Sequence, residues 1–337
     1  MRVPAGADAD PGGRHGDELG VPADRAALVR HRGLLVGGYA LIAVAAALVI
    51  GDVDRPTVFV AAIGAVLVTC VGSPRPLART LVAWLPLLVI VGSYDVVRAQ
   101  TASLVPRAHL DPQLSFDTWL GFGTTPSRRL QDSLYVPGRL NWFDVAALAV
   151  YATHFVGGIL VAGCLWVRAR RHFARFAATI LLLTMAGFTT YLVYPAIPPW
   201  MASARGALPG VVRVVPRLWS LLGVKDLAHV FSGSDKYSNP VGALPSEHAA
   251  YPMLFLLFFW GLTKRRWIRA LLVGYTLAMA FVLVYLGEHY VADILLGWLY
   301  ALVAFLVVHR LAQRRAARLA PVSAGPAAAG APEEPDA

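Results

Sequence analysis

Long apolar runs separated by short charged segments dominate this chain of 337 residues. A transmembrane helix needs about 20 mostly apolar residues, with a range of about 17–25. Eight runs reach or approach that length, at residues 34–50, 57–72, 80–97, 144–167, 173–194, 249–263, 268–286 and 290–309. The composition agrees, because only 15% of the residues are charged, against about 25% in soluble domains. We therefore predict an all-α, polytopic membrane protein with about eight transmembrane helices.

The Lys and Arg residues are distributed unevenly over the loops between these runs. If the N-terminus is cytoplasmic, the cytoplasmic segments hold 19 of the 30 Lys and Arg residues and the outer segments hold 11. Four lie at 168–175 and four at 264–269, whereas Arg55 is alone in the first outer loop. This is the positive-inside pattern, so the net charge of +10 does not indicate a nucleic-acid partner. It predicts a cell-membrane protein with both termini in the cytoplasm.

The ends of the chain differ in composition from the apolar centre. Residues 1–33 and 312–337 are rich in Gly, Ala, Pro and charged residues, which is typical of disorder. We expect a disordered cytoplasmic N-terminus, a membrane-embedded domain at 34–311, and a disordered cytoplasmic tail.

Two outer segments, 98–143 and 195–248, are too long to be simple turns. Each contains an amphipathic stretch, Leu114–Leu120 in the first and Leu218–Leu222 in the second. Such stretches either lie flat in the membrane interface or cap the helix bundle, and the sequence leaves both arrangements open.

A His and an Asp begin the last apolar run, in the sequence His289-Tyr-Val-Ala-Asp293. Residues four apart share one face of a helix, and ionisable side chains at membrane depth are costly enough to indicate function. A carboxylate at Asp293 can hold one imidazole nitrogen of His289 and leave the other free to attack. A buried ion pair that joins two spans is the structural alternative.

A second polar group, Pro245-Ser246-Glu247-His248, precedes the run 249–263. Ser is a preferred N-terminal cap of a helix, and the backbone amides after a cap form an anion site. His248 would stand there as a proton donor. An ordinary helix start with an interfacial histidine is the alternative. Two such groups on one side of the membrane favour phosphoryl transfer through a phosphohistidine.

The order Pro-Ser-x-His and then His-Tyr-x-x-Asp resembles the type-2 phosphatidic acid phosphatase superfamily. The stretch Tyr194-Pro195-Ala-Ile-Pro198-Pro199-Trp200 resembles its inositol phosphorylceramide synthase branch. The resemblance covers 144–309 well and 80–143 loosely. It implies a six-helix core of phosphatidic-acid-phosphatase type with cap segments on the outer face, which would make 34–311 the catalytic domain.

The resemblance also implies roles for individual residues. His289 matches the nucleophile, Asp293 its orienting carboxylate, and His248 the residue that protonates the leaving group. Ser246 and nearby amides match contacts to the substrate phosphate.

Two positions depart from the superfamily pattern. Seven and six positions before the nucleophile the superfamily has Ser-Arg, and this chain has Val282 and Leu283. That phosphate-binding arginine is therefore missing, as it is in the inositolphosphotransferase branch. Glu247 stands where the superfamily has Gly, and an acid beside an anion site suits a pairing with Arg or Lys, or a contact to an acceptor hydroxyl.

A bound phosphate still needs cations. Arg98 at the end of the third run and Lys236 before Ser246 are the candidates, although Arg98 also suits an interfacial anchor paired with Asp95. Arg205, Arg213 and Arg217 in the second outer segment suit headgroup contacts.

Four further residues are expected around the site without touching the phosphorus: Asp95, His154, Tyr285 and Trp200. His154 lies inside the run 144–167. It suits a packed core position, or a hydrogen bond to Asp95 or to the bound headgroup.

These patterns predict a membrane phosphotransferase that acts on a lipid phosphate or phosphodiester at the outer leaflet. The acceptor is a lipid or polyol hydroxyl in an inositolphosphotransferase-like enzyme, or water in a polyprenyl or phosphatidic acid type phosphatase. We expect no cofactor and no metal, because no third conventional zinc ligand accompanies His289 and Asp293.

A non-catalytic transporter or scaffold is a third interpretation, although no paired broken helices are evident. The excess of Arg over Lys favours a bacterial source, and the lipid, the acceptor and the oligomeric state stay open.

Overall fold

The computed structural model describes residues 77–222 and 239–319, together with residues 34, 35, 37–39, 41, 42, 64 and 68. The described residues of the first two expected spans are helical. Most of those two spans lies outside the described residues, as do the expected disordered segment 1–33, Lys236, and the tail from residue 320.

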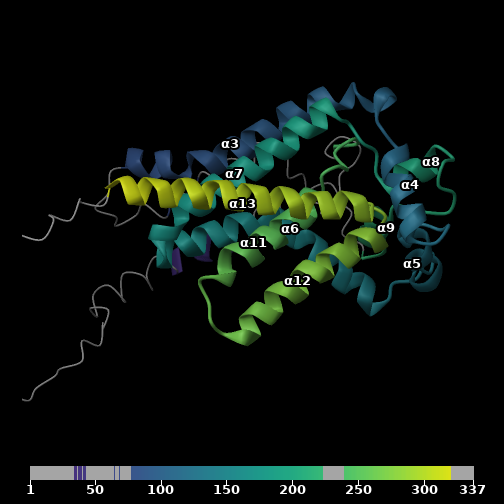
Figure 1. The fold of residues 1–337 in the computed structure, drawn as a ribbon. Helices are drawn as coiled ribbons and strands as arrows, with labels where there is room; N and C mark the ends of the chain where they lie inside the picture. The colour runs from purple at the N-terminus through teal and green to yellow at the C-terminus, as the bar shows by residue number, and fades with distance from the viewer. Residues whose placement is uncertain are drawn as a thin grey trace, which may run out of the picture.

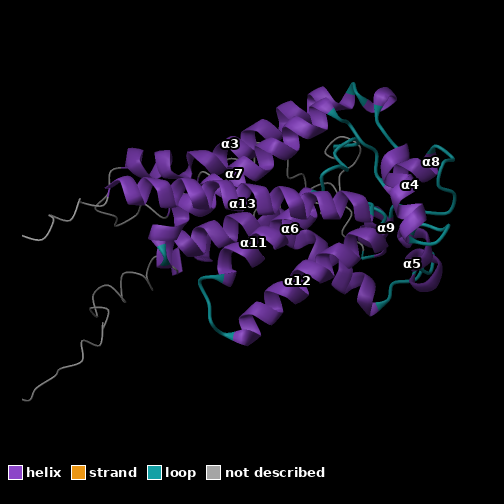
Figure 2. Cartoon of the chain, in the orientation of Figure 1, coloured by secondary structure: helices purple, strands orange, loops and turns teal. Residues whose placement is uncertain are grey.

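Six long helices form the bundle in the described part of the chain (Figure 1). They are α3 (Leu77–Ala102), α6 (Trp142–Arg168), α7 (Arg170–Val193), α11 (Glu247–Trp260), α12 (Arg266–Tyr285) and α13 (Val291–Leu319). Each matches one expected span, and all except α11 are long and apolar enough to cross a membrane. The described residues include no β-strand (Figure 2), so the all-α prediction is confirmed.

The last helix is longer than expected. We expected the membrane domain to end at residue 311, whereas α13 continues to Leu319. The added residues are Ala, Arg, Gln and Leu, which are among the best helix formers, so the helix continues past its apolar part.

Short helices close one end of the bundle, which we call the cap end (Figure 1). They are α4 (Asp111–Leu120), α5 (Pro126–Leu134), α8 (Pro199–Ala204) and α9 (Val214–Leu221). All four come from the two long connecting segments. Val214, Val215 and Leu218 are fully buried against α6 and α12. The second amphipathic stretch therefore packs on the bundle as part of a cap, which was one of the two arrangements left open.

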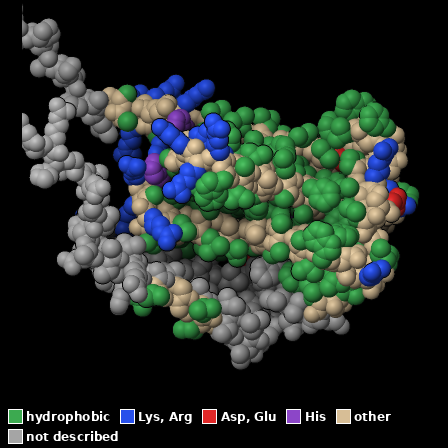
Figure 3. All heavy atoms as spheres, turned by 90° about the horizontal axis from the view of Figure 1, so that it is seen from below, with side chains coloured by type: hydrophobic (Ala, Val, Ile, Leu, Met, Phe, Trp, Pro, Cys, Tyr) green, Lys and Arg blue, Asp and Glu red, His purple; other side chains and the backbone are tan. Residues whose placement is uncertain are grey.

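Lys and Arg side chains gather at the opposite end, which we call the basic end (Figure 3). There α6 is followed by α7 and α11 by α12, with Arg168, Arg171 and Arg265 at least partly exposed. Much of the surface between the two ends is hydrophobic in this view (Figure 3). A helical bundle with an apolar middle and a basic end is the arrangement that a bilayer requires, so the chain is a multi-pass membrane protein.

Candidate active site

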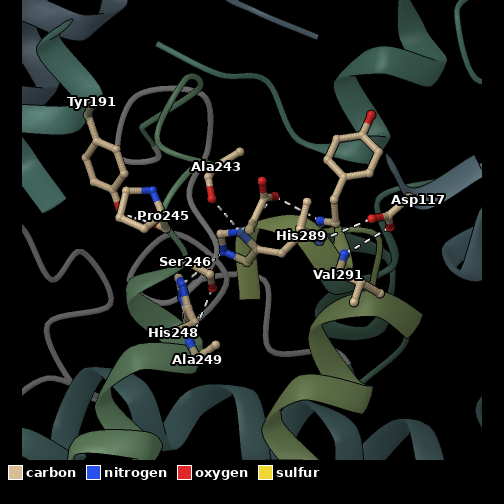
Figure 4. Close-up of polar contacts among 12 residues, drawn as sticks. Asp117, Tyr191, Ala243, Pro245, Ser246, His248, Ala249, His289 and Val291 are labelled. Atoms are coloured by element: carbon tan, nitrogen blue, oxygen red, sulfur yellow. Dashed lines mark hydrogen bonds and ion pairs between the residues drawn. The ribbon is translucent and has the colours of Figure 1, made fainter. Parts of the chain in front are cut away.

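The starts of α11 and α13 meet at the cap end, which brings the two polar groups expected from the sequence together (Figure 4). The Ser246 N–H donates a hydrogen bond of 3.0 Å to the Asp293 carbonyl oxygen. Gly297 of α13 allows this approach, because a Cβ there would lie 2.3 Å from the Ser246 carbonyl oxygen. Main-chain atoms therefore join the two motifs.

The His289 imidazole has one nitrogen held and one turned toward His248 (Figure 4). Nδ1 lies 3.0 Å from the Ala243 carbonyl oxygen and 3.6 Å from Oδ2 of Asp293. A carbonyl oxygen only accepts, so the hydrogen is assigned to Nδ1. Nε2 then carries a lone pair and lies 3.4 Å from Nδ1 of His248. This nitrogen has the electronic form of a nucleophile.

Asp293 is fully buried and faces His289, as expected, but it also caps its own helix. Its Oδ2 accepts a hydrogen bond of 2.9 Å from the Tyr290 N–H, which is the acidic half of a capping box. Its Oδ1 has no hydrogen-bond partner among the described residues. The carboxylate therefore orients the helix start and the imidazole together.

Asp117 of α4 is a site residue that the sequence did not reveal. Its carboxylate accepts hydrogen bonds of 2.9 Å from the Val291 N–H and 3.1 Å from the Ala292 N–H (Figure 4). Burial raises the pKa of Asp117 to about 6, and the charge of Asp293 adds to this rise, while the two backbone hydrogen bonds oppose it. The only sequence signal was an acid within an amphipathic stretch.

His248 is fixed by aromatic packing. Its ring stacks on His154, with centroids 3.9 Å apart, and on Tyr151 at 5.0 Å. Its Nε2 is buried and has no hydrogen-bond partner among the described residues. His154 therefore lies against His248, so a hydrogen bond to Asp95 is not the contact observed.

Ser246 and Glu247 face different surroundings. Ser246 is the N-cap of α11, and its hydroxyl accepts from the Ala249 N–H at 3.3 Å, so the predicted cap is confirmed. The Glu247 carboxyl turns toward α7, where a Cβ at Gly187 would lie 2.5 Å from its Oε1. Within the described residues Glu247 forms no ion pair, and its Oε1 has no hydrogen-bond partner.

The proline-rich stretch before α8 supports the site through its main chain. The Ala196 N–H donates to the Val241 carbonyl oxygen at 3.0 Å, and the Ala243 N–H donates to the Ala196 carbonyl oxygen at 3.2 Å. Ala196 thereby fixes the residue whose carbonyl oxygen holds His289. The Trp200 N–H also bonds to the Gly287 carbonyl oxygen at 3.2 Å, close to the histidine in sequence.

Arg213, just before α9, pairs with the residue that precedes His289. Its Nε lies 2.9 Å and its Nη2 3.3 Å from the two oxygens of Glu288. Its guanidinium lies over the Trp200 ring, 4.7 Å from the ring centroid. Both charged side chains are largely buried, with exposures of 14% and 9%.

Arg98 and Tyr285 contact side chains outside the two motifs. Arg98 Nε is 3.6 Å from Oδ1 of Asp95, which is the pairing we named as an alternative; its contact to phosphate stays a prediction. The Tyr285 hydroxyl donates to Asp144 and so joins α12 to α6.

Six long helices, a cap, and paired His-Asp and Ser-x-His groups at one end define a class of helical membrane protein. A family model described as the PAP2 superfamily matches residues 114–307. The chain belongs to the PAP2 superfamily, which confirms the family predicted from the motifs.

Two curated relatives also match. The chain is 32% identical over 170 residues, 48% of its length, to a phosphoinositol dihydroceramide synthase of Bacteroides thetaiotaomicron. It is 30% identical over 139 residues, 40% of its length, to the inositol phosphorylceramide synthase catalytic subunit aur1 of Schizosaccharomyces pombe. The matches span 54% of the first relative and 32% of the second. No solved structure matches the chain significantly.

Proposed function

We propose that this protein is a membrane phosphotransferase that moves a phosphorus-bearing headgroup from a lipid to a hydroxyl acceptor, in the manner of an inositolphosphotransferase. The observation that carries the proposal is the held imidazole of His289, whose Nε2 lone pair faces His248 at 3.4 Å. The names of the two relatives support this reaction class.

In the first half-reaction, the Nε2 lone pair of His289 attacks phosphorus and forms a P–N bond. The bond from phosphorus to the lipid oxygen breaks, and that oxygen takes a proton from His248, so the lipid leaves as an alcohol. The Ala243 carbonyl oxygen and Asp293 stabilise the positive charge that develops on the ring of His289. Ser246 and the amides that follow it hold phosphate oxygens.

In the second half-reaction, His248 accepts a proton from the acceptor hydroxyl. The oxygen attacks phosphorus, the P–N bond breaks, and His289 regains its lone pair. No metal enters either step. Glu247, with its buried carboxyl, suits a contact to an acceptor hydroxyl, and Arg98 and Lys236 are proposed cation contacts to the phosphate.

The proposed location of the site is the outer leaflet. The basic residues of the 168–175 and 264–269 segments lie at the end of the bundle opposite the cap, and basic ends face the cytoplasm. The proposal therefore has the lipid headgroup bound beside the cap and both termini in the cytoplasm.

The test uses purified protein with lipids labelled at phosphorus, with and without inositol or a lipid alcohol. We expect label to move intact to the alcohol, an acid-labile phosphoenzyme to form, and EDTA to leave the rate unchanged. His289→Ala should abolish transfer and phosphoenzyme alike, whereas the control His309→Ala, near the basic end, should keep them. Release of free phosphate at the same rate with and without alcohol would favour the phosphatase, and activity in His289→Ala would overturn the mechanism.

A further inference from the structure

This chain lacks the superfamily arginine, so the site lacks one positive charge that would bind the substrate phosphate. Val282 and Leu283, which replace Ser and Arg of the superfamily pattern, are 5% and 0% exposed and pack in the core between α6, α9 and α12. Their side chains add no cation at the end of α12. A transferred phosphate carries negative charge on its equatorial oxygens, so another element must supply the compensating charge.

Two neighbouring side chains hold Arg213 in one orientation. The two hydrogen bonds to Glu288 and the packing on Trp200 fix the plane of its guanidinium. A guanidinium fork matches phosphate oxygens as well as it matches a carboxylate. Because both side chains are largely buried, little solvent screens the charge.

Arg213 also contacts the segment that leads into His289. Its partner Glu288 is the chain neighbour of His289. Arg213 also packs on Trp200, whose N–H bonds to the carbonyl oxygen of Gly287, two residues before His289. By contrast, the outer-segment residues Arg205 and Arg128 donate to the backbone oxygens of Val105 and Pro209 in the cap.

We propose that Arg213 replaces the superfamily arginine as the cation that binds the nonbridging oxygens of the substrate phosphate, with Glu288 positioning its guanidinium. The inference rests on the proposed function and assigns a residue of the connecting segment to the phosphate site. The Glu288 carboxylate has two effects. It orients the fork, and it also offsets part of the positive charge that the phosphate meets.

Orthovanadate is a suitable probe, because it resembles a phosphate in phosphoryl transfer and needs no turnover. Its dissociation constant is measured by calorimetry on the purified full-length protein, and that of a short-chain lipid phosphate by competition. We expect Arg213→Ala to weaken both at least about tenfold and Arg213→Lys to recover part of the loss, since an ammonium lacks the fork. The control Arg129→Ala removes a charge from the cap and should change neither by more than about twofold.

The variant Glu288→Gln distinguishes two roles of Arg213, a contact to the substrate phosphate and a purely structural ion pair with Glu288. It keeps an acceptor oxygen for Arg213 and removes the negative charge, so vanadate should bind about threefold tighter or better. If Arg213→Ala and Glu288→Gln only lower the melting temperature and leave both dissociation constants unchanged, the proposal is overturned. A tenfold loss in Arg98→Ala with none in Arg213→Ala would overturn it as well. These binding constants are independent of turnover, so failure to transfer label would overturn the proposed function alone.

Discussion

At the scale of single residues, the most informative side chain is His289, because two groups hold the same nitrogen. The Ala243 carbonyl oxygen is nearer to Nδ1 than the Asp293 carboxylate is, at 3.0 Å against 3.6 Å. The carbonyl oxygen alone can keep the hydrogen on Nδ1. Asp293 therefore adds charge stabilisation and helix capping to a tautomer that is already fixed.

Asp293→Asn should consequently reduce turnover by about 100-fold, less than the ~10⁴-fold loss caused by the wrong tautomer in a serine protease triad. The comparison is kcat for Asp293→Asn against wild type and against His289→Ala, in the same detergent. A loss in Asp293→Asn as complete as that in His289→Ala would mean that the Ala243 carbonyl oxygen does not hold the tautomer.

Asp117 makes the stability of the folded chain depend on pH. Its pKa is about 6 in the folded chain, against 3.8 for an aspartate in a short unstructured peptide, so folding favours its neutral form. Below about pH 4, the neutral Asp117 makes its full contribution to the free energy of unfolding. This contribution falls as the pH rises from 4 to 6, and above pH 6 it stays at its lowest value. The rise in pKa corresponds to about 3 kcal/mol.

Other groups titrate in the same range, so the prediction concerns the difference between two proteins. Between pH 4 and pH 7 the melting temperature of wild type should fall more than that of Asp117→Asn, whose side chain does not ionise. Melting curves of the detergent-solubilised proteins at half-unit pH steps provide the measurement. Parallel curves would contradict the assigned ionisation of Asp117.

At the scale of secondary-structure elements, the contact between α11 and α13 determines the site. At Gly297 the two helices are too close to admit a side chain, since an added Cβ would lie 2.3 Å from the Ser246 carbonyl oxygen. Backbone atoms cannot give way as a flexible side chain does, so any side chain at 297 forces the two helix starts apart.

We expect Gly297→Ala to cost about 1–3 kcal/mol of stability and to lower turnover about 100-fold, because a displacement of about 1 Å is enough to misplace reacting groups. Gly274→Ala on α12 is the matched control, because a Cβ there would meet no described atom within 4 Å apart from the adjacent residues and the backbone of its own helix. That substitution should leave turnover unchanged and stabilise its helix slightly. Equal turnover in the two variants would show that the close contact is not required.

The helices and the two motifs could be predicted because each has a local pattern. The apolar runs predicted five helices close to their observed bounds, and a sixth, α13, that extends ten residues beyond its run; the residues around Ser246 identify it as an N-cap. The contacts of Asp117 with α13, Ala196 with Ala243, and Arg213 with Glu288 join residues far apart in the chain. No periodicity marks such pairs, so only the three-dimensional arrangement reveals them.

At the scale of the whole molecule, the two ends of the bundle predict its orientation. We expect the basic end, with 168–172 and 264–267, to face the cytoplasm and the cap end to face outward. In a chain without Cys70 and Cys164, a single Cys at Arg265 should resist a membrane-impermeant thiol reagent in intact cells. A Cys at Ser133, exposed in the cap, should react. The reverse labelling would refute the orientation and, with it, the outer-leaflet site.

The crossing of α11 and α13 also has a consequence for biosynthesis. Ser246 and His248 begin one late helix, whereas His289 and Asp293 lie at the start of the final described helix. A ribosome therefore completes most of the described bundle before it synthesises the proposed nucleophile, and a product that stops at the end of α12 has His248 but not His289. Under the proposed mechanism, the nascent chain can act on lipids only after α13 has followed His289 into the membrane.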